Sequence, residues 1–352
     1  MSGFLRFLSI LFFPLVIIYT FLVYLRLKLY EWGWFKSCSA SGPVISVGNV
    51  QIGGTGKTPM VEFLAETILE LHRIPVIISR GYRRKTNDPV IIKPGESDNY
   101  TADMIGDEPL MLSRNVKDAF LLIDSNRCRA AKDKIARDEG SVIILDDGFQ
   151  HRKIKRDLNI VMIDISRWSD LPFLFPLTTF RDVKSSLRFA DCAILTHSDK
   201  FEEKKERLKN WLMTHYNFPV YFLNYKPQSI INLVTGEQIQ VESIISKKVA
   251  CFCGIANPLQ FYEMLQDIQL QIDWQKSYRD HHEYQESDLK FIVNQAKKIN
   301  AHIIVTTQKD AVKLEHFSKD ELSNIYYLKI DCEIDPFDEF SQQLRKVLYP
   351  EK

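Results

Sequence analysis

The sequence predicts an α/β protein with a doubly wound parallel sheet, a strand linker, a second and smaller α/β domain, and an N-terminal membrane-associated helix. Three observations support this. Short apolar runs alternate with helical patterns up to residue 216, a glycine-rich loop follows the first run, and the chain begins with a long uncharged stretch. The expected strands of the first domain are 43–47, 76–79, 120–123, 142–145, 160–164 and 192–196.

Composition is typical of a globular protein, because 45% of the 352 residues are hydrophobic and 26% are charged. This length is enough for two domains. The formal net charge of +1 gives no global basic field, so nucleic acid is not an expected partner. Among the six cysteines, the close pair Cys251 and Cys253 has a spacing that suits neither zinc nor a redox dithiol. We expect all six to be reduced.

The N-terminal stretch from Phe7 to Leu25 carries no charge, and as a helix it would extend roughly 28 Å. Pro14 interrupts it and basic residues flank it, which favours a helix that enters the membrane obliquely over one that spans it. A cleaved signal peptide and a buried hairpin are the alternatives. Export conflicts with the nucleotide-binding loop that follows shortly after Lys36.

A phosphate-binding loop is predicted after the first strand. Pro43–Val50 reads as a buried strand, QIGGTGKT follows it, and a helical pattern starts at Pro59. Glycine N–H groups and a helix N-terminus suit phosphate oxygens, the lysine reaches the transferred group, and the threonine offers a magnesium ligand. Glutamine replaces the usual first glycine. In this P-loop NTPase-type domain, the residues expected to bind ATP are Gln51, Ile52, Gly53, Gly54, Thr55, Gly56, Lys57 and Thr58.

Two aspartates follow another predicted strand. The apolar run Ser141–Leu145 ends at Asp146 and Asp147, an arrangement by which P-loop proteins hold the magnesium shell. Together with Thr58, these aspartates are the predicted Mg2+ ligands. A pair of turn aspartates is the alternative interpretation.

Polar residues also follow these strands at the edge where α/β sheets bind ligands. Arg80 and Tyr82 come after strand 76–79. An arginine at this place suits a phosphate group carried by a second substrate, and a tyrosine suits a sugar ring. Gln150 and His151 suit contacts to a sugar. The basic residues that follow suit phosphate or anionic lipid, and equally a solvated turn.

Adjacent carboxylates occur at Asp107 and Glu108, before the proline of IGDEPLML. A proline at this position favours an ordered turn. Near bound ATP, the two carboxylates are candidates for proton transfer or metal binding, although the motif alone is only a turn.

The segments SVGNVQIGGTGKTP, SRGYRR, GDEPLML, ILDDGFQHRKIKRD and TTQKDAVKL together resemble the tetraacyldisaccharide 4'-kinase family (LpxK) of lipid A biosynthesis, in order and in spacing. The resemblance covers most of the chain. It implies transfer of the ATP γ-phosphate to the 4'-hydroxyl of an acylated disaccharide 1-phosphate lipid, which forms lipid IVA. It also implies a location at the cytoplasmic face of the bacterial inner membrane, anchored by the N-terminal helix.

The resemblance further implies roles for individual residues. The family's catalytic aspartate and histidine fall on Asp107 and His281, which would act with Lys57. Asp107 would accept the proton of the acceptor hydroxyl, and His281 would orient Asp107 or hold its proton. His282 is the second choice for the histidine.

The acceptor contacts implied by the same resemblance are Arg80, Tyr82, Gln150, His151 and Arg181. The last of these lies in FRDV, where the family segment has glutamate in place of Asp182. Gln308 likewise stands at a glutamate position of the family, in the segment TTQKDAVKL. We assign that segment no role beyond ending a strand at the edge of the site.

Four segments are expected: a membrane-associated helix (1–35), the P-loop kinase domain (36–216), a two-stranded linker (217–247) with turns at 226–228 and 235–236, and a C-terminal α/β domain (248–352). Because the catalytic pair comes from both domains, the active site should lie in the cleft between them. Competing functions are a kinase of another alcohol and a membrane-bound ATPase switch. The switch would hydrolyse ATP without an acceptor.

Overall fold

The computed structural model describes residues 3–82, 84–86, 88–197, 201–245 and 247–350. Within these residues, one sheet of 13 strands has the order β11-β10-β12-β13-β8-β7-β6-β1-β5-β2-β4-β3, with β9 paired to β8. The strands are β1 (Val44–Asn49), β2 (Ile74–Ser79), β3 (Val90–Ile92), β4 (Phe120–Ile123), β5 (Ser141–Leu145), β6 (Leu158–Asp164), β7 (Cys192–Thr196), β8 (Val220–Asn232), β9 (Gln238–Ile239), β10 (Lys248–Cys253), β11 (Gln271–Ser277), β12 (Ile303–Thr307) and β13 (Ile325–Asp335). The α-helices are α1 (Gly3–Glu31), α2 (Lys57–Glu70), α3 (Ala102–Ile105), α4 (Asp107–Asn115), α5 (Arg127–Ala130), α6 (Glu202–Tyr216), α7 (Pro258–Asp267), α8 (Glu286–Lys298), α9 (Gln308–Ala311), α10 (Lys319–Leu322) and α11 (Phe337–Leu348).

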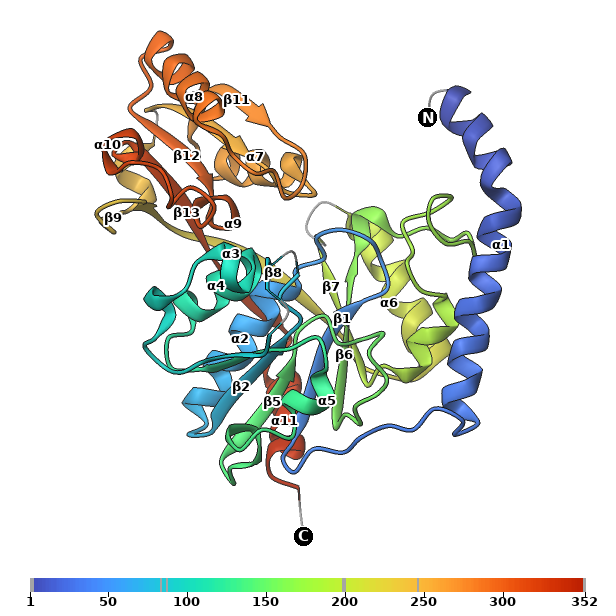
Figure 1. Ribbon diagram of the computed structural model, residues 1–352. Helices are drawn as coiled ribbons and strands as arrows, with labels where there is room; N and C mark the ends of the chain where they lie inside the picture. Colours follow the sequence, from blue (N-terminus) through green and yellow to red (C-terminus); the bar gives the residue numbers. More distant parts are fainter. Residues whose placement is uncertain (1–2, 83, 87, 198–200, 246, 351–352) are drawn as a thin grey trace.

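The first lobe has the predicted doubly wound arrangement (Figure 1). Strands β7, β6, β1, β5, β2 and β4 run parallel, and β3 adds an antiparallel edge. Side chains alternate between the two faces of the sheet: Ile160 and Met162 pack with α2, α4 and α11, whereas Val161 and Ile163 pack with α1 and α6. The predicted fold class is confirmed, and every strand expected in this domain is present.

The second lobe is a smaller α/β unit. Strands β11, β10 and β12 are parallel, with α7 packed on one face and α8 on the other. Strand β11 was not expected from the sequence, because this edge strand is mostly exposed and has no buried apolar run.

The two lobes are joined by β8 and β13, which pair antiparallel over most of their length (Figure 1). The prediction of a turn at 226–228 is wrong, since these residues lie inside the continuous strand β8. Pro227 sits opposite Ile330, where the register shifts. The partner of β8 is distant in the sequence, and a local turn signal cannot reveal such a pairing.

Helix α11 returns to the first lobe after β13. Its residues Phe340, Leu344 and Leu348 are buried in the same cluster as Leu64 and Ile68 of α2. The end of the chain therefore packs on the phosphate-loop helix and not on the second lobe.

Helix α1 runs along the outside of the first lobe and continues through Pro14 without a break (Figure 1). Val16 and Leu27 are buried against the lobe, and Phe13 contacts Phe173 edge-to-face. Most other large apolar side chains of residues 13–24 are exposed. The helix is thus attached to the domain along one side and apolar on the other.

The expectation of reduced cysteines is wrong for one pair, because Cys38 and Cys128 form a disulfide. They are 90 residues apart in the sequence. The segment after α1 forms a β-bridge with Ile154, which brings it beside the start of α5. The other cysteines are free, and three of them are buried as packing residues.

Gly48 of β1 lies where the backbone of this strand closely approaches the backbone at Phe149. A β-carbon there would lie 2.4 Å from the backbone nitrogen of Phe149. Gly48→Ala should therefore lower the free energy of unfolding by about 1–3 kcal/mol or more, measured by thermal denaturation. Gly54→Ala, with no atom within 4 Å of the added carbon, is the matched control. Equal stability of the two variants would contradict the close approach.

Candidate active site

A cleft of about 970 Å3 lies between the lobes, at the carboxyl ends of β1, β2 and β5. Parallel sheets bind ligands at this edge. The predicted site residues that line it are Gly53, Gly54, Thr55, Gly56, Lys57, Thr58, Arg80, Tyr82, Asp107, Asp146, Asp147, Gln150, His151, Arg181 and His281. The tertiary structure thus brings nearly all of them into one space.

The phosphate loop connects β1 to α2. Gly53 and Gly56 have φ angles of 98° and 81°, a region that favours glycine. The side-chain amide of Asn49 donates to the hydroxyl of Thr55 at 2.7 Å, which braces the loop from inside. Lys57 is the first residue of α2, so the helix N-terminus and the lysine act at the same place.

Gln51 shows how the loop forms without the usual first glycine. Its side chain is fully buried, donates to the carbonyl of Asp164 at 3.0 Å and accepts from the N–H of the same residue at 2.8 Å. These two bonds fix the start of the loop to the end of β6. The side chain therefore shapes the loop, and neither Gln51 nor Ile52 lines the cleft.

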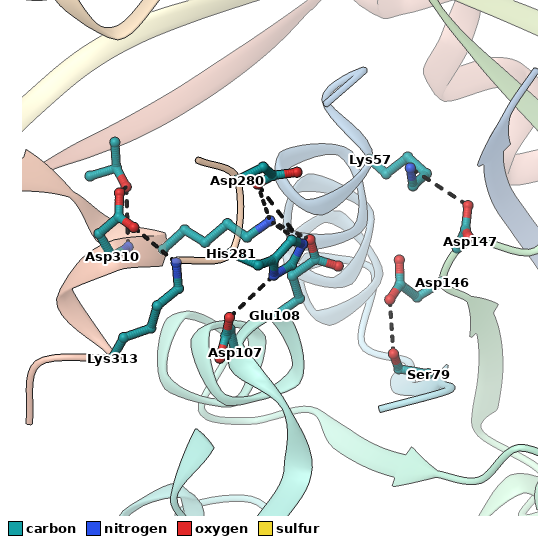
Figure 2. Close-up of polar contacts among 12 residues, drawn as sticks. Lys57, Ser79, Asp107, Glu108, Asp146, Asp147, Asp280, His281, Asp310 and Lys313 are labelled. Carbon is teal, nitrogen blue, oxygen red and sulfur yellow. Dashed lines mark hydrogen bonds and ion pairs between the residues drawn. The ribbon is translucent and has the colours of Figure 1, made fainter. Parts of the chain in front are cut away.

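Asp146 and Asp147 follow β5 and differ in their surroundings (Figure 2). Asp146 is buried and accepts a hydrogen bond from the hydroxyl of Ser79 at 2.9 Å. Burial raises the pKa of Asp146 to about 6, and nearby carboxylates add to this effect. Asp147 pairs with Arg181 and lies 3.6 Å from Nζ of Lys57. Burial alone would raise the pKa of Asp147, but these two cations outweigh it and lower the pKa.

Asp107 and His281 meet across the lobes, as Figure 2 shows. Nδ1 of His281 lies 3.4 Å from Oδ2 of Asp107, which is the first residue of α4. Burial would raise the pKa of Asp107, but the hydrogen bond from His281 and the charge of Lys313 outweigh it and lower the pKa. His282 instead contacts Asp288 at 2.9 Å within its own lobe. Of the two neighbouring histidines, His281 is therefore the one beside the carboxylate.

Lys309 completes this cluster from the second lobe. Its Nζ lies 3.0 Å from Oε1 of Glu108 and 3.2 Å from Nε2 of His281. It is also 3.8 Å from Asp280. Burial would lower the pKa of Lys309, but the charges of Glu108 and Asp280 outweigh it and raise the pKa, so the ammonium stays charged.

The acceptor contacts expected from the sequence also line the cleft. Arg80 and Tyr82 are exposed, and the Tyr82 ring is edge-on to His281. The amide of Gln150 donates to the carbonyl of Asn49 at 2.7 Å. Burial, with help from nearby cations, lowers the pKa of His151 to about 4 and keeps this ring neutral.

Arg181 and its neighbour Asp182 have separate environments. The guanidinium of Arg181 binds both carboxylate oxygens of Asp147. Asp182 is buried and accepts from the N–H of Val183 at 2.9 Å and from the amide of Gln150 at 3.3 Å. The aspartate at this position therefore braces the loop that carries Gln150.

Comparison with known proteins decides the family. The family model described as Tetraacyldisaccharide-1-P 4'-kinase (LpxK) matches residues 8–349. The chain belongs to the tetraacyldisaccharide 4'-kinase family. A tetraacyldisaccharide 4'-kinase of Syntrophus aciditrophicus is 35% identical over 335 residues, which cover 93% of this chain and 89% of the relative. That of Desulfotalea psychrophila is 35% identical and covers 87% of this chain and 88% of its own length.

A solved LpxK structure from Aquifex aeolicus, described as an "apo" form in complex with ATP, has the same fold. It superposes with a TM-score of 0.76 at 25% identity and covers 97% of this chain and 100% of the other. The family and fold inferred from the sequence are confirmed. Tetraacyldisaccharide-1-P 4'-kinase activity in lipid A biosynthesis is the function of this family member, as predicted.

Two residues of this 4'-kinase site were missed in the sequence. Arg127 is buried just after β4, lines the cleft and donates to the carbonyl of Asp146 at 2.6 Å. Its place after a parallel strand was the signal that could have found it. Lys309 carries the same signal, since it follows the parallel strand β12, but its ion-pair partner Glu108 belongs to the other lobe.

Glu62 of α2 gives this 4'-kinase a testable pH response. It lines the cleft and accepts from the amide of Asn115 at 2.8 Å. Burial raises the pKa of Glu62 to about 8, whereas an unfolded glutamate titrates near 4.3. The neutral form therefore stabilises the fold at low pH, and this contribution is lost as pH rises towards 8.

Glu62→Gln, which mimics the neutral form, should become more stable relative to wild type as pH rises from 5.5 to 8.5. The expected gain is a few kcal/mol at most. Thermal unfolding of both proteins at the two pH values measures it. A constant difference in Tm would contradict the raised pKa.

Proposed function

We propose that this kinase transfers the γ-phosphate of ATP, with Mg2+, to the 4'-hydroxyl of a tetraacyldisaccharide 1-phosphate bound between the lobes. The observation that carries the proposal is that Lys57 and the Asp107–His281 pair line one cleft. ATP as donor is further supported by the similarity to the relative solved with ATP.

The phosphate loop would bind the ATP phosphates through the backbone N–H groups of Gly53 to Thr58 and the N-terminus of α2. Lys57 would contact the transferred phosphoryl group. Lys57 and Arg181 both lie at Asp147, so two positive charges are available where negative charge is concentrated in phosphoryl transfer.

The donor set of the site fits Mg2+, which prefers oxygen ligands. Thr58 and Asp146 line the cleft together, and the Asp146 carboxylate is buried against a neutral hydroxyl, so a divalent cation would stabilise its charge. The charge of Asp147 is already balanced by Lys57 and Arg181, so this carboxylate would be a secondary ligand of the metal. When bound, Mg2+ would neutralise charge on the phosphate oxygens.

The Asp107–His281 pair would remove the acceptor proton. Asp107 is a weak base because its pKa is lowered, and its carboxylate faces Nδ1 of His281, so Nε2 is the ring nitrogen on the other side of the pair. We therefore assign proton acceptance to Nε2 of His281, with Asp107 holding the hydrogen on Nδ1. This reverses the roles first expected for the two residues. The O–H bond of the 4'-hydroxyl breaks, its oxygen bonds to the γ-phosphorus, the bond to the departing ADP breaks, and Nε2 keeps the proton.

The acceptor head would bind between α1 and the loops after β2 and β5. Arg80 is an exposed cation suited to a sugar phosphate, and Tyr82 offers a ring beside His281. His151 and Gln150 would contact the sugar from the neighbouring loop. Arg181, which is held by Asp147, would act on the side of the transferred phosphate.

Membrane association through α1 would deliver the lipid. Residues 13–31 form a helix long and apolar enough to cross a membrane, with 11% of it buried in the protein. Tyr19 and Arg26 of this helix also line the cleft. We propose that α1 lies partly in the cytoplasmic leaflet of the inner membrane and opens the cleft towards it. The exposed Trp32 and Trp34 suit the membrane interface.

We retain the division into an N-terminal helix, a P-loop kinase domain, a strand linker and a C-terminal α/β domain. The packing supports two adjustments: the linker is formed by β8 together with β13, and α11 is part of the kinase domain.

The experiment that tests the proposal follows labelled γ-phosphate from ATP to a tetraacyldisaccharide 1-phosphate in detergent micelles. Wild type and the exposed-site control Lys298→Ala should transfer label with Mg2+ and lose transfer when the metal is chelated. Asp107→Ala and Lys57→Ala should be strongly impaired. ATP hydrolysis that is equally fast with and without the lipid would overturn the proposal.

A further inference from the structure

We propose that Lys309 is a positioning residue that selects the tautomer of His281, an inference that rests on the role of His281 proposed above. Lys309 belongs to the segment TTQKDAVKL, to which the sequence assigned no function. Its side chain is 20% exposed and its ammonium reaches two groups of the active site. These are Glu108 of the first lobe and His281 of the second.

The direction of the hydrogen bonds determines the tautomer. A lysine ammonium only donates, so at 3.2 Å it requires a lone pair on Nε2 of His281. The hydrogen of a neutral imidazole is then on Nδ1, which faces the Asp107 carboxylate at 3.4 Å. The ring is thereby held with Nε2 free of hydrogen. This is the form in which Nε2 can accept a proton from the 4'-hydroxyl.

The segment around Lys309 also fixes the backbone of His281. The buried carboxylate of Asp310 accepts from the N–H of Gly254 at 2.8 Å, and the carbonyl of Gly254 accepts from the N–H of His281 at 3.1 Å. The hydroxyl of Thr307 donates to the same carboxylate at 2.7 Å. Lys313 donates to it at 2.9 Å (Figure 2). One short segment therefore sets both the position of the histidine and the lysine that faces its ring.

The bond between Lys309 and Glu108 makes this arrangement depend on the meeting of the two lobes. Glu108 follows Asp107 in α4, so both partners of the lysine–histidine unit come from the first turn of one helix. Burial would raise the pKa of Glu108, but Lys309 outweighs it and lowers the pKa, so Glu108 is ionised. Glu108 gives the ammonium a second partner, so Lys309 can release the single lone pair of Nε2 when the acceptor hydroxyl approaches.

The kinetic test compares Lys309→Met, which keeps the length but loses the donor, with Lys309→Arg, which keeps a charged donor. Lys309→Met should lower kcat by about 10- to 100-fold while the KM values for ATP and lipid change less than about threefold. Lys309→Arg should recover at least about tenfold of this loss. Lys298→Met, on the exposed side of α8, controls for loss of a lysine charge and should match wild type.

A spectroscopic test separates tautomer selection from a structural role. In protein labelled with 15N in its histidine rings, the His281 signals are those missing from His281→Gln. Wild type should show a protonated Nδ1 and an unprotonated Nε2, and Lys309→Met should show a mixture of forms. Unchanged ring signals in Lys309→Met together with a lower kcat would overturn the proposal, because the tautomer would not depend on the lysine. A raised KM for ATP with no change in kcat would also overturn it and would make Lys309 a phosphate ligand.

A double-mutant cycle keeps this result separate from the proposed function. If Lys309 acts through His281, Lys309→Met should cost nothing further in a His281→Gln background. Additive losses would overturn the inference alone. An active His281→Gln protein would instead overturn the proposed proton acceptor, whatever the behaviour of Lys309.

Discussion

Lys57→Met should lower kcat by on the order of 10³-fold or more with little change in the fold. The reaction needs alignment and charge neutralisation more than covalent help, and Lys57 stands at the start of α2 where the phosphates would bind. The remaining partner of Asp147, Arg181, stays in place in the variant. Single-turnover transfer of labelled phosphate at saturating ATP measures the effect.

Thr67→Ser, a conservative change farther along the same helix, is the control for effects on α2 itself, since a hydroxyl still reaches the carbonyl of Phe63. Its kcat should stay near that of wild type. If Lys57→Met retains turnover within about tenfold of wild type, phosphate binding is not centred on this lysine. A larger loss for Asp107→Asn than for Lys57→Met would also contradict the ranking of charge neutralisation above proton transfer.

Asp107→Asn and His281→Gln should each lower kcat by about 10²- to 10⁴-fold, the usual contribution of general base catalysis. Both substitutions keep a side chain that can form hydrogen bonds. Asp107→Asn removes the negative charge that faces Nδ1 of His281, and His281→Gln removes the proton acceptor. Because the two side chains act as one unit across 3.4 Å, the double variant should be no worse than His281→Gln alone. Steady-state kinetics of the four proteins with the lipid acceptor completes the comparison.

His282→Gln is the matched control for the histidine. It should leave kcat close to wild type, because His282 binds Asp288 inside the second lobe. Equal loss from both histidine variants would mean that the segment 280–282 acts through its fold and not through the His281 ring. Strictly additive losses for Asp107 and His281 would mean that they serve different steps.

Local signals in the sequence were sufficient for the phosphate loop and the paired aspartates. A strand, a glycine loop and a helix follow each other within Val44–Glu70, so backbone geometry and chemistry are encoded in adjacent residues. The same holds for Asp146 and Asp147 at the end of β5. Such features need only the rule that polar residues after parallel strands meet at one edge.

The family was also evident from the order of its motifs, which do not depend on how the lobes meet. The linker shows the limit of local signals. Pro227 reads as a turn, yet its backbone continues β8 because β13 pairs with it from about a hundred residues away. The Cys38–Cys128 disulfide, whose cysteines are 90 positions apart in the sequence, is a second contact of this kind.

The sequence by itself thus determined the fold class, the family, the nucleotide loop and the identity of the candidate acid and base groups. Only the tertiary structure decided that His281 and not His282 faces Asp107. It also decided that Gln51 fixes the phosphate loop to the end of β6 and that Lys309 reaches the imidazole. The physical reason is that loop and strand-end chemistry is set by neighbours in the chain. The orientation of the His281 imidazole is set by Asp107, which folding brings from the other lobe, and by Lys309, which comes from a distant segment of the same lobe.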